Sequence, residues 1–395
     1  MGAEPQSYLP DLLPTTETVR PRESANLDLL RAVAVGAVFA THVLATLKLS
    51  PPSPMTRWDL GRLGVLLFFV HTSLVLMQSL ERLKLDGVPL MMSFALRRIV
   101  RIYPLSILFV VFATAVSMPA SPWKPAGYVW MGWFHLASNL ALTQNLTFSP
   151  SAIGPLWSLP YELQMYALLP LIFLLVRARP TLGRALGLWG ASVVLALIQP
   201  SLGARFGVAE FGPCFIAGTI AYVGLKLTPA RLPSWLWPVA LVGSAAVFLA
   251  GPRLYSSWLF CLTVGMAIPH FREITTPWLR RVSALVAKYS YGIYLSHPVA
   301  LWVAFRVAAS LPAAAHWSIL IGLSVLLPVA SFHLIEQPFI VLGKTWADRR
   351  FHTPRLVPTV LAPASTNTPD PAPVPVPAAE IRLPAPPRES SVVTT

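Results

Sequence analysis

The chain alternates between long apolar windows and short polar connections over most of its length. Ten windows lie at 28–47, 61–80, 101–118, 160–176, 185–201, 210–226, 235–250, 255–270, 289–309 and 316–337. A helix needs about 20 apolar residues to cross the hydrocarbon core, and these windows lack the alternating pattern of a membrane β-barrel. The pattern predicts an all-α polytopic membrane protein, a bundle of about ten transmembrane helices.

The stretch at 119–160 is the ambiguous part of this pattern. It contains YVWMGWFHLASNLALTQNLTF, which is apolar but interrupted by Trp, His, Asn and Gln. Counting it as a span would invert every later segment and move Arg177, Arg179 and Arg184 to the outer side. It is therefore expected to form a re-entrant or amphipathic segment on the outer side.

The basic side chains indicate how the bundle sits in the membrane. With the N-terminus inside, most Lys and Arg fall on inner connections, among them Arg97, Arg98, Arg272 and Arg280. Positive residues collect on the cytoplasmic side, so both termini are expected in the cytoplasm. The same bias explains the net charge of +14 in a chain that is 55% hydrophobic and 12% charged, and no nucleic-acid partner is expected.

The two ends of the chain differ in composition from the membrane part. Residues 1–25 are polar and lack the apolar core of a signal peptide, so a cytoplasmic N-terminal segment is expected. Residues 26–342 form the membrane domain, and residues 351–395 are Pro-rich without a periodic apolar face, which predicts a disordered cytoplasmic tail. Cys214 and Cys261 lie within apolar runs, so neither a disulfide nor a metal site is predicted.

The first window contains two ionisable side chains, Arg31 and His42, in an otherwise apolar run. The eleven positions between them make almost three helical turns, so both lie on one helix face roughly 16 Å apart along the axis. Ionisable groups inside a membrane normally face a bundle interior or a cavity and mark a reaction site or a pathway. The alternative is a snorkelling arginine and a histidine that a neighbouring helix satisfies.

Two further arginines, Arg98 and Arg101, lie one helical turn apart at the inner mouth of the third window. A purely topological role is the alternative for any single arginine at the end of a span. Together with Arg31, however, they make a cluster of three guanidinium groups plausible. Such a cluster suits phosphate, which arginine binds with paired donors.

An acidic residue, Glu162, stands at the outer start of the fourth window. It either complements the helix dipole or, at a depth similar to that of His42, orients and charges the imidazole. Tyr294, His297 and Glu336 have simpler explanations as interface, packing and helix-end residues.

Several motifs occur in a fixed order over about residues 26–342. They are LDLLRAVAVGAVFATHV, LGVLLFFVHTSL, LRRIVRIYPL, GPLWSLPYELQMYALLPLI, YSYGIYLSHPV and LIEQPFI. Together they resemble the acyltransferase-3 family of membrane O-acyltransferases, most specifically in the Arg-to-His spacing and the Trp-Ser-Leu-x-x-Glu block. The second window departs from the family, which usually has an aliphatic residue and a glycine where this chain has His71 and Ser73.

The resemblance implies that Arg31, His42, Arg98, Arg101 and Glu162 are functional positions, with His42 as the catalytic histidine. Members of the family move acyl groups from acyl-coenzyme A inside the cell to hydroxyls of glycans, lipids or secondary metabolites. The chain is therefore expected to transfer an acetyl or another short acyl group to a glycan, a lipid-linked sugar or a small metabolite. The expected location is the bacterial inner membrane, and no metal is required.

In the expected mechanism the arginines hold the phosphates of acyl-coenzyme A and His42 acts as general base on the acceptor hydroxyl. Glu162 stabilises the imidazolium that forms, and Asn139 or Asn145 is a candidate donor to the oxyanion.

The rival interpretation is a proton-coupled transporter or flippase that uses His42, His71 and Glu162 as a relay. The concentration of arginine at one mouth and the lack of matching broken spans in two halves count against it. A non-catalytic membrane scaffold is a third, weaker interpretation, because buried polar groups are costly.

Overall fold

The computed structural model describes residues 24–51, 53, 55–121 and 128–351. The chain divides into two units, Met1–Thr353 and Pro354–Thr395, and all described residues belong to the first. The expected tail at 351–395 lies outside the described residues except for its first position, and so does nearly all of the expected segment at 1–25.

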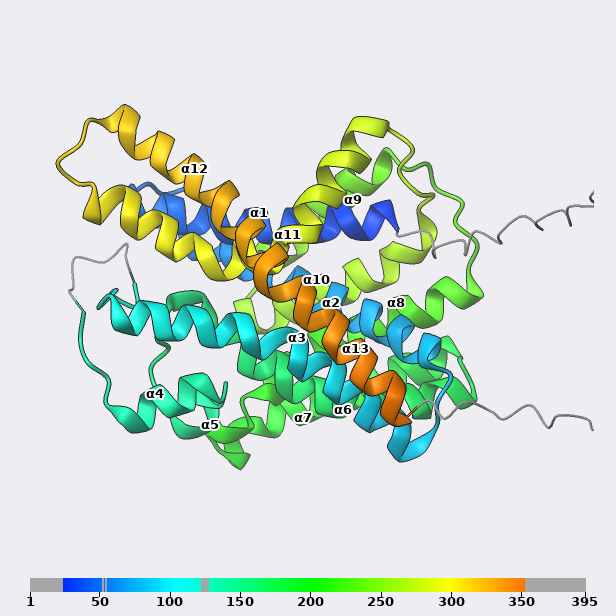
Figure 1. Cartoon of the computed structure of the whole chain (residues 1–395). Coiled ribbons are helices and arrows are strands. Elements are labelled where there is room, and N and C mark those ends of the chain that lie inside the picture. The colour runs from blue at the N-terminus through cyan, green and yellow to red at the C-terminus, as the bar shows by residue number, and fades with distance from the viewer. Residues whose placement is uncertain (1–23, 52, 54, 122–127, 352–395) are drawn as a thin grey trace, which may run out of the picture. The chain divides into compact units, whose positions relative to one another are not determined.

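The described residues form helices and no strand (Figure 1). The longer helices are α1 (Ala25–Thr46), α2 (Arg57–Leu83), α3 (Gly87–Ala115), α6 (Leu159–Ala178), α7 (Leu182–Leu202), α8 (Val208–Leu227), α9 (Leu236–Leu249), α10 (Arg253–Ala267), α11 (Pro277–Trp302), α12 (Ala313–Ser331) and α13 (Gln337–Phe351). The short ones are α4 (Trp133–Leu140), α5 (Gln144–Thr147), the 3₁₀ helices η1 (Gly154–Ser158), η2 (Ala204–Phe206) and η3 (Ile268–His270), and the π-helical turns η4 (Val303–Val307) and η5 (Phe332–Glu336).

The predicted all-α membrane bundle is confirmed, whereas the number of spans is not. Each of the ten predicted windows coincides with a helix, but seven helical segments among the described residues are long and apolar enough to cross a membrane. Helices α9 and α10 have 14 and 15 residues, which at about 1.5 Å per residue fall short of the hydrocarbon core.

The segment at 119–160 contains two short helices in its described part. Helix α4 has 8 residues and α5 has 4, so neither extends beyond about 12 Å. The described part of this segment thus holds no helix that spans the membrane, as the sequence predicted.

Three helices pack so closely that glycine is required between them. A Cβ on Gly218 of α8 would lie 2.3 Å from the carbonyl oxygen of Val70 in α2, and a Cβ on Gly64 of α2 would lie 2.5 Å from the carbonyl oxygen of Ala34 in α1. In lipid, where apolar surface gains little from burial against another helix, small residues that let backbones approach are a main source of association. Helices α1, α2 and α8 therefore form the packed centre that positions the site.

The start of α1 is fixed by one buried asparagine. The side-chain nitrogen of Asn26 donates to the carbonyl of Arg272 at 3.0 Å, and its side-chain oxygen accepts from the amide of Ile274 at 3.2 Å. The indole of Trp237 in α9 donates to the carbonyl of Asn26 at 3.2 Å. These contacts set the position of α1 along its axis, and with it the position of every side chain on that helix.

We predict that Gly218→Ala destabilises the protein by about 1 to 3 kcal/mol, the usual range for overpacking a filled interior. The matched control is Gly190→Ala in α7, where nothing lies within 4 Å of the added methyl group. There alanine should be neutral or stabilising by about 0.5 to 1 kcal/mol through helix propensity. Thermal unfolding in detergent, followed by circular dichroism, measures both; equal melting temperatures for the two variants would contradict the close approach.

Candidate functional site

Two neighbouring cavities share the same walls, because α1, α2, α11 and the η1–α6 segment line both. The larger, of about 470 Å³, is called the histidine cavity here and is lined by Val38, Thr41, His42, Trp58, Asp59, Gly61, Arg62, Val65, Ser121, Gly154, Pro155, Trp157, Arg253 and Tyr294. The smaller, of about 70 Å³, is called the arginine cavity and is lined by Arg31, His71, Thr72, Val75, Leu76, Arg98, Arg101, Ile102, Glu162, Tyr166 and Tyr291.

A chain of hydrogen bonds sets the orientation of His42. Its Nδ1 lies 2.8 Å from Nε2 of His297 on α11, and Nδ1 of His297 lies 3.1 Å from the carbonyl oxygen of Ile293. A carbonyl only accepts, so Nδ1 of His297 carries a proton, and in the neutral ring its Nε2 accepts from Nδ1–H of His42. This tautomer makes Nε2 the basic nitrogen of His42.

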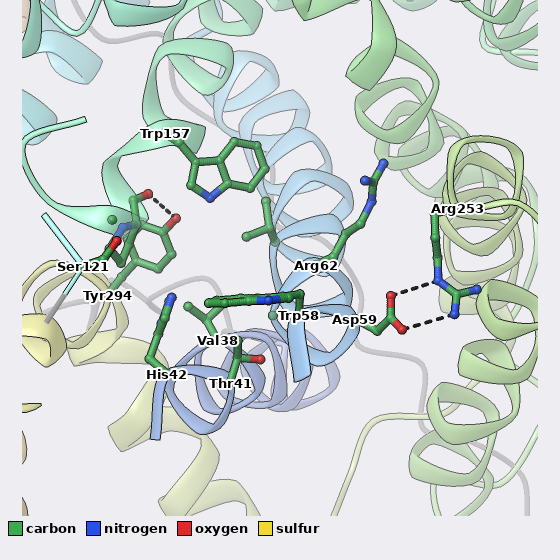
Figure 2. Close-up of a pocket in the computed structure, with 14 residues that line it drawn as sticks. Val38, Thr41, His42, Trp58, Asp59, Arg62, Ser121, Trp157, Arg253 and Tyr294 are labelled. Carbon is green, nitrogen blue, oxygen red and sulfur yellow. Dashed lines mark hydrogen bonds and ion pairs between the residues drawn. The ribbon is translucent and has the colours of Figure 1, made fainter. Parts of the chain in front are cut away.

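The ring of His42 projects into the histidine cavity. Figure 2 shows it standing between Tyr294 and Trp58, with Trp157 across the cavity. The rings of His42 and Trp58 meet edge to face, with centroids 6.4 Å apart. A molecule in this cavity would therefore contact the imidazole and two indoles at once.

The rim of the histidine cavity is held by ion pairs. Nε and Nη2 of Arg253 donate to the two carboxylate oxygens of Asp59 at 2.8 and 3.1 Å (Figure 2). Asp59 also completes a capping box with Thr56 at the start of α2, while Nη1 of Arg253 donates to the carbonyl of Phe248 at the end of α9. Arg62 pairs with Glu210 of α8 at 3.3 Å. These contacts join α2, α8, α9 and α10 around one opening.

The arginine cavity brings together the three predicted guanidinium groups. Arg31 of α1 lines it with Arg98 and Arg101 of α3, so the predicted cluster is present. Nε of Arg31 and Nε of Arg98 are buried without a hydrogen-bond partner among the described residues. Unpaired buried donors are costly, which fits a site that receives an anionic or strongly accepting group.

Two carboxylates lie in or beside the arginine cavity. Glu336, at the end of the π-helical turn η5, is fully buried and accepts from Nη2 of Arg101 at 3.2 Å. Glu162 accepts a short hydrogen bond from the hydroxyl of Tyr166 one turn along α6. Each acidic group offsets part of the positive charge of the cluster, which is otherwise expensive to bury.

The structure places Glu162 and His42, which were expected to act together, in the linings of different cavities. Glu162 lines the arginine cavity, whereas the ring nitrogen of His42 bonds to His297. Glu162 lies in the first turn of α6, but the 3₁₀ helix η1 precedes α6, so the continuous helical segment begins at Gly154 rather than near 160. His71 also lines the arginine cavity, so the three groups of the expected proton relay are divided between two cavities.

Asn139 is unsuited to the oxyanion role expected for it. Its amide donates to the carbonyls of His135 at 2.8 Å and Pro150 at 2.9 Å, and its oxygen accepts from the amide of Ala152 at 2.8 Å. Both amide protons of Asn139 are engaged in hydrogen bonds to carbonyl groups, so this side chain stabilises the fold of the 119–160 segment. The side-chain oxygen of Asn145 accepts from Gln164 at 3.0 Å.

Several site residues were missed by sequence reasoning. His297 was interpreted as a packing residue, and the rim residues Asp59, Arg62 and Arg253 carried no local pattern, since 194 positions separate Asp59 from Arg253. The signals for His297 were an imidazole within an apolar run, the proline that follows it, and its place in the motif YSYGIYLSHPV. Among the described residues no group of three His, Cys, Asp or Glu side chains is placed to hold a metal ion.

Comparisons with known proteins give consistent findings. A family model described as an acyltransferase domain, acyltransferase-3, matches residues 24–333, which include every residue that lines the two cavities. The acyltransferase MdmB of Streptomyces mycarofaciens is 30% identical over 224 residues, which cover 54% of this chain and 53% of that protein. The chain thus matches about half the length of that relative. No solved structure gives a significant match.

We predict that Glu336→Gln destabilises the protein by about 1.5 to 3 kcal/mol, because it removes the charge-assisted hydrogen bond between the partly exposed Arg101 and a fully buried carboxylate. The matched control is Asp86→Asn, which breaks the exposed pair between Asp86 and Arg177 and should cost less than about 1 kcal/mol. Thermal unfolding in detergent separates the two. A Glu336→Gln variant as stable as the control would contradict the burial of Glu336 against Arg101.

Proposed function

We propose that this chain, which belongs to the acyltransferase-3 family of membrane acyltransferases, transfers an acyl group from acyl-coenzyme A to an acceptor hydroxyl with His42 as general base. The observation that carries the proposal is the hydrogen-bond chain from Ile293 through His297 to His42, which makes Nε2 the basic nitrogen of a ring that lines the histidine cavity.

The arginine cavity is proposed to take the phosphate end of the donor. Arg31, Arg98 and Arg101 offer paired donors, which suit phosphate oxygens. A volume of about 70 Å³ admits only part of acyl-coenzyme A, so the nucleotide extends toward the cytoplasm. The positions of Arg31 and His42 on one helix face leave roughly 16 Å for the thin pantetheine arm.

The reaction step is proposed to occur at Nε2 of His42. That nitrogen removes the hydroxyl proton while the hydroxyl oxygen attacks the thioester carbon, and the carbon–sulfur bond then breaks. The proton held by His42 passes to the departing thiolate, which leaves as the free thiol of coenzyme A. Nε2 of His297 stabilises the transient imidazolium by accepting a hydrogen bond from Nδ1–H of His42, the role that the sequence had given to Glu162.

The acceptor is proposed to occupy the histidine cavity. Trp58 and Trp157 present flat apolar faces, while the indole nitrogen of Trp157 and the guanidinium of Arg62 are the donors placed to meet an oxyanion. This lining suits a ring that bears hydroxyl groups, such as a glycan, a lipid-linked sugar or a small metabolite. We propose that the protein lies in the bacterial cytoplasmic membrane with both termini in the cytoplasm. The transferred group is proposed to be an acetyl or another short acyl group.

The roles of the arginines and the histidine should separate in kinetics. Arg98→Ala or Arg101→Ala should weaken donor binding roughly tenfold to hundredfold, the loss of one charge-assisted contact of about 1.5 to 3 kcal/mol. His42→Ala should leave donor binding nearly unchanged while turnover falls by about 10² to 10⁴. Donor binding to purified variants, measured beside transfer of a labelled acyl group, tests this. Wild-type transfer by His42→Ala would refute the general base and favour a transporter.

His297 should act on turnover through the tautomer of His42. His297→Phe removes the hydrogen-bond acceptor, so turnover should fall roughly tenfold to hundredfold, about 1.5 to 3 kcal/mol of transition-state stabilisation. His297→Gln, whose amide oxygen accepts from Nδ1–H, should recover part of that loss, with donor KM unchanged in both. Equal turnover in the two variants would argue for a packing role alone.

A further inference from the structure

The histidine and arginine cavities lie in sequence along one face of α2. Val65 lines the first and Thr72 lines the second, and Phe68 stands between them at spacings of three and four residues. Positions three and four apart share a helix face. Phe68 therefore occupies the position on this helix face between the residues that line the two cavities.

The other three shared elements show the same order, and on α1 Val38 lines the first cavity and Arg31 the second. On α11, Tyr294 lines the histidine cavity, and Tyr291, one turn earlier, lines the arginine cavity. On the η1–α6 segment, Pro155 lines the first cavity and Glu162 the second. The two linings are thus separated by one turn on α11 and by about two turns on α1, so along these helices the cavities come closest at Tyr294, which contacts Phe68.

Two aromatic rings form the centre of this layer. Phe68 and Tyr294 meet edge to face, with centroids 5.9 Å apart and planes at 78°. The hydroxyl of Tyr294 donates to the carbonyl of Pro155 at 2.7 Å and accepts from Oγ of Ser158 at 2.7 Å. Tyr294 is 6% exposed, whereas Phe68 is half-buried and carries no polar group to hold its ring. The hydrogen bonds therefore fix the ring of Tyr294, whereas the ring of Phe68 can rotate.

We infer that Phe68 is the movable wall between the donor and acceptor ends of the site and sets the size of the acyl group delivered to His42. The inference rests on the proposed function: with the phosphates held at Arg31, Arg98 and Arg101, the acyl end of the donor leads toward His42. The thioester then passes between Phe68 and Tyr294. No bond to Phe68 forms or breaks, and its ring only rotates about its side-chain torsions.

The size of the side chain at position 68 then has a defined effect. Phe68→Ala should open the wall and admit branched or longer acyl groups and water, while Phe68→Trp should narrow it. A difference of one methylene in a fitted pocket changes discrimination by roughly 10- to 200-fold. The matched control is Phe69→Leu, since Phe69 points away and stacks on Phe215 of α8 with centroids 4.4 Å apart.

The first experiment compares kcat/KM for acetyl- and hexanoyl-coenzyme A, together with thioester hydrolysis when no acceptor is present. Phe68→Ala should raise the hexanoyl-to-acetyl ratio at least about tenfold and increase hydrolysis, and Phe68→Trp should lower transfer from both donors with donor binding retained. Phe69→Leu should keep the wild-type ratio. An unchanged ratio in Phe68→Ala, or the same shift in Phe69→Leu, would overturn the inference.

The second experiment needs no turnover. The full-length protein, with Cys214 and Cys261 replaced by alanine, is reconstituted into sealed vesicles. A charged thiol reagent that does not cross the bilayer is then applied on the side to which the histidine cavity opens. Val65→Cys should react whether or not Phe68 is present, and Thr72→Cys should react at least about tenfold faster when combined with Phe68→Ala. If Thr72→Cys reacts with the thiol reagent at the same rate with Phe68 and with Phe68→Ala, the inference that Phe68 separates the cavities is overturned, even if acyl transfer is normal. If the cysteines are labelled as predicted but the protein does not consume acyl-coenzyme A, the role of Phe68 as the wall between the cavities is supported and acyl-coenzyme A as the donor is overturned.

Discussion

The burial of charge is the constraint on which this structure depends. Arg31, Arg98 and Arg101 surround a cavity inside an apolar bundle, where an unpaired guanidinium is far more costly than at a surface. Glu162 and Glu336 offset part of that cost from two other helices. The carboxylates can offset the charge of the guanidinium groups only if the helices keep their positions relative to one another. The close glycine contacts between α1, α2 and α8 therefore stabilise the arrangement of charges as well as the packing.

The site has two chemical halves built from the same helices. The arginine cavity is small and ionic, and some of its buried donors lack a hydrogen-bond partner among the described residues. The histidine cavity is aromatic and several times larger, and it contains His42 of the histidine pair. A single helix, α1, contributes Arg31 to the first half and His42 to the second. Any shift of α1 along its axis would change both halves together, which makes the anchoring of its first turn by Asn26 a condition for the whole arrangement.

Local periodicity was enough to predict the helices, the Arg31–His42 face and the cluster of three arginines. It was insufficient where a position depended on the true start of a helix. Helix α3 begins at Gly87, so Arg98 and Arg101 lie well inside it rather than at its mouth, and the helical segment of Glu162 begins at Gly154. The pairing of His42 with His297 joins positions 255 apart, and no spacing rule within one helix reports such a contact.

The ion pairs around the histidine cavity have a consequence for the kinetics of encounter. Asp59 with Arg253 and Arg62 with Glu210 are two balanced pairs, so these ion pairs add no net charge beside the histidine cavity, whereas the arginine cavity keeps an excess of positive groups. Electrostatic steering acts on ligands of opposite charge and weakens as salt screens the field. Ionic strength should thus slow the arrival of an anion at one end of the bundle and leave the entry of an uncharged molecule at the other almost unaffected.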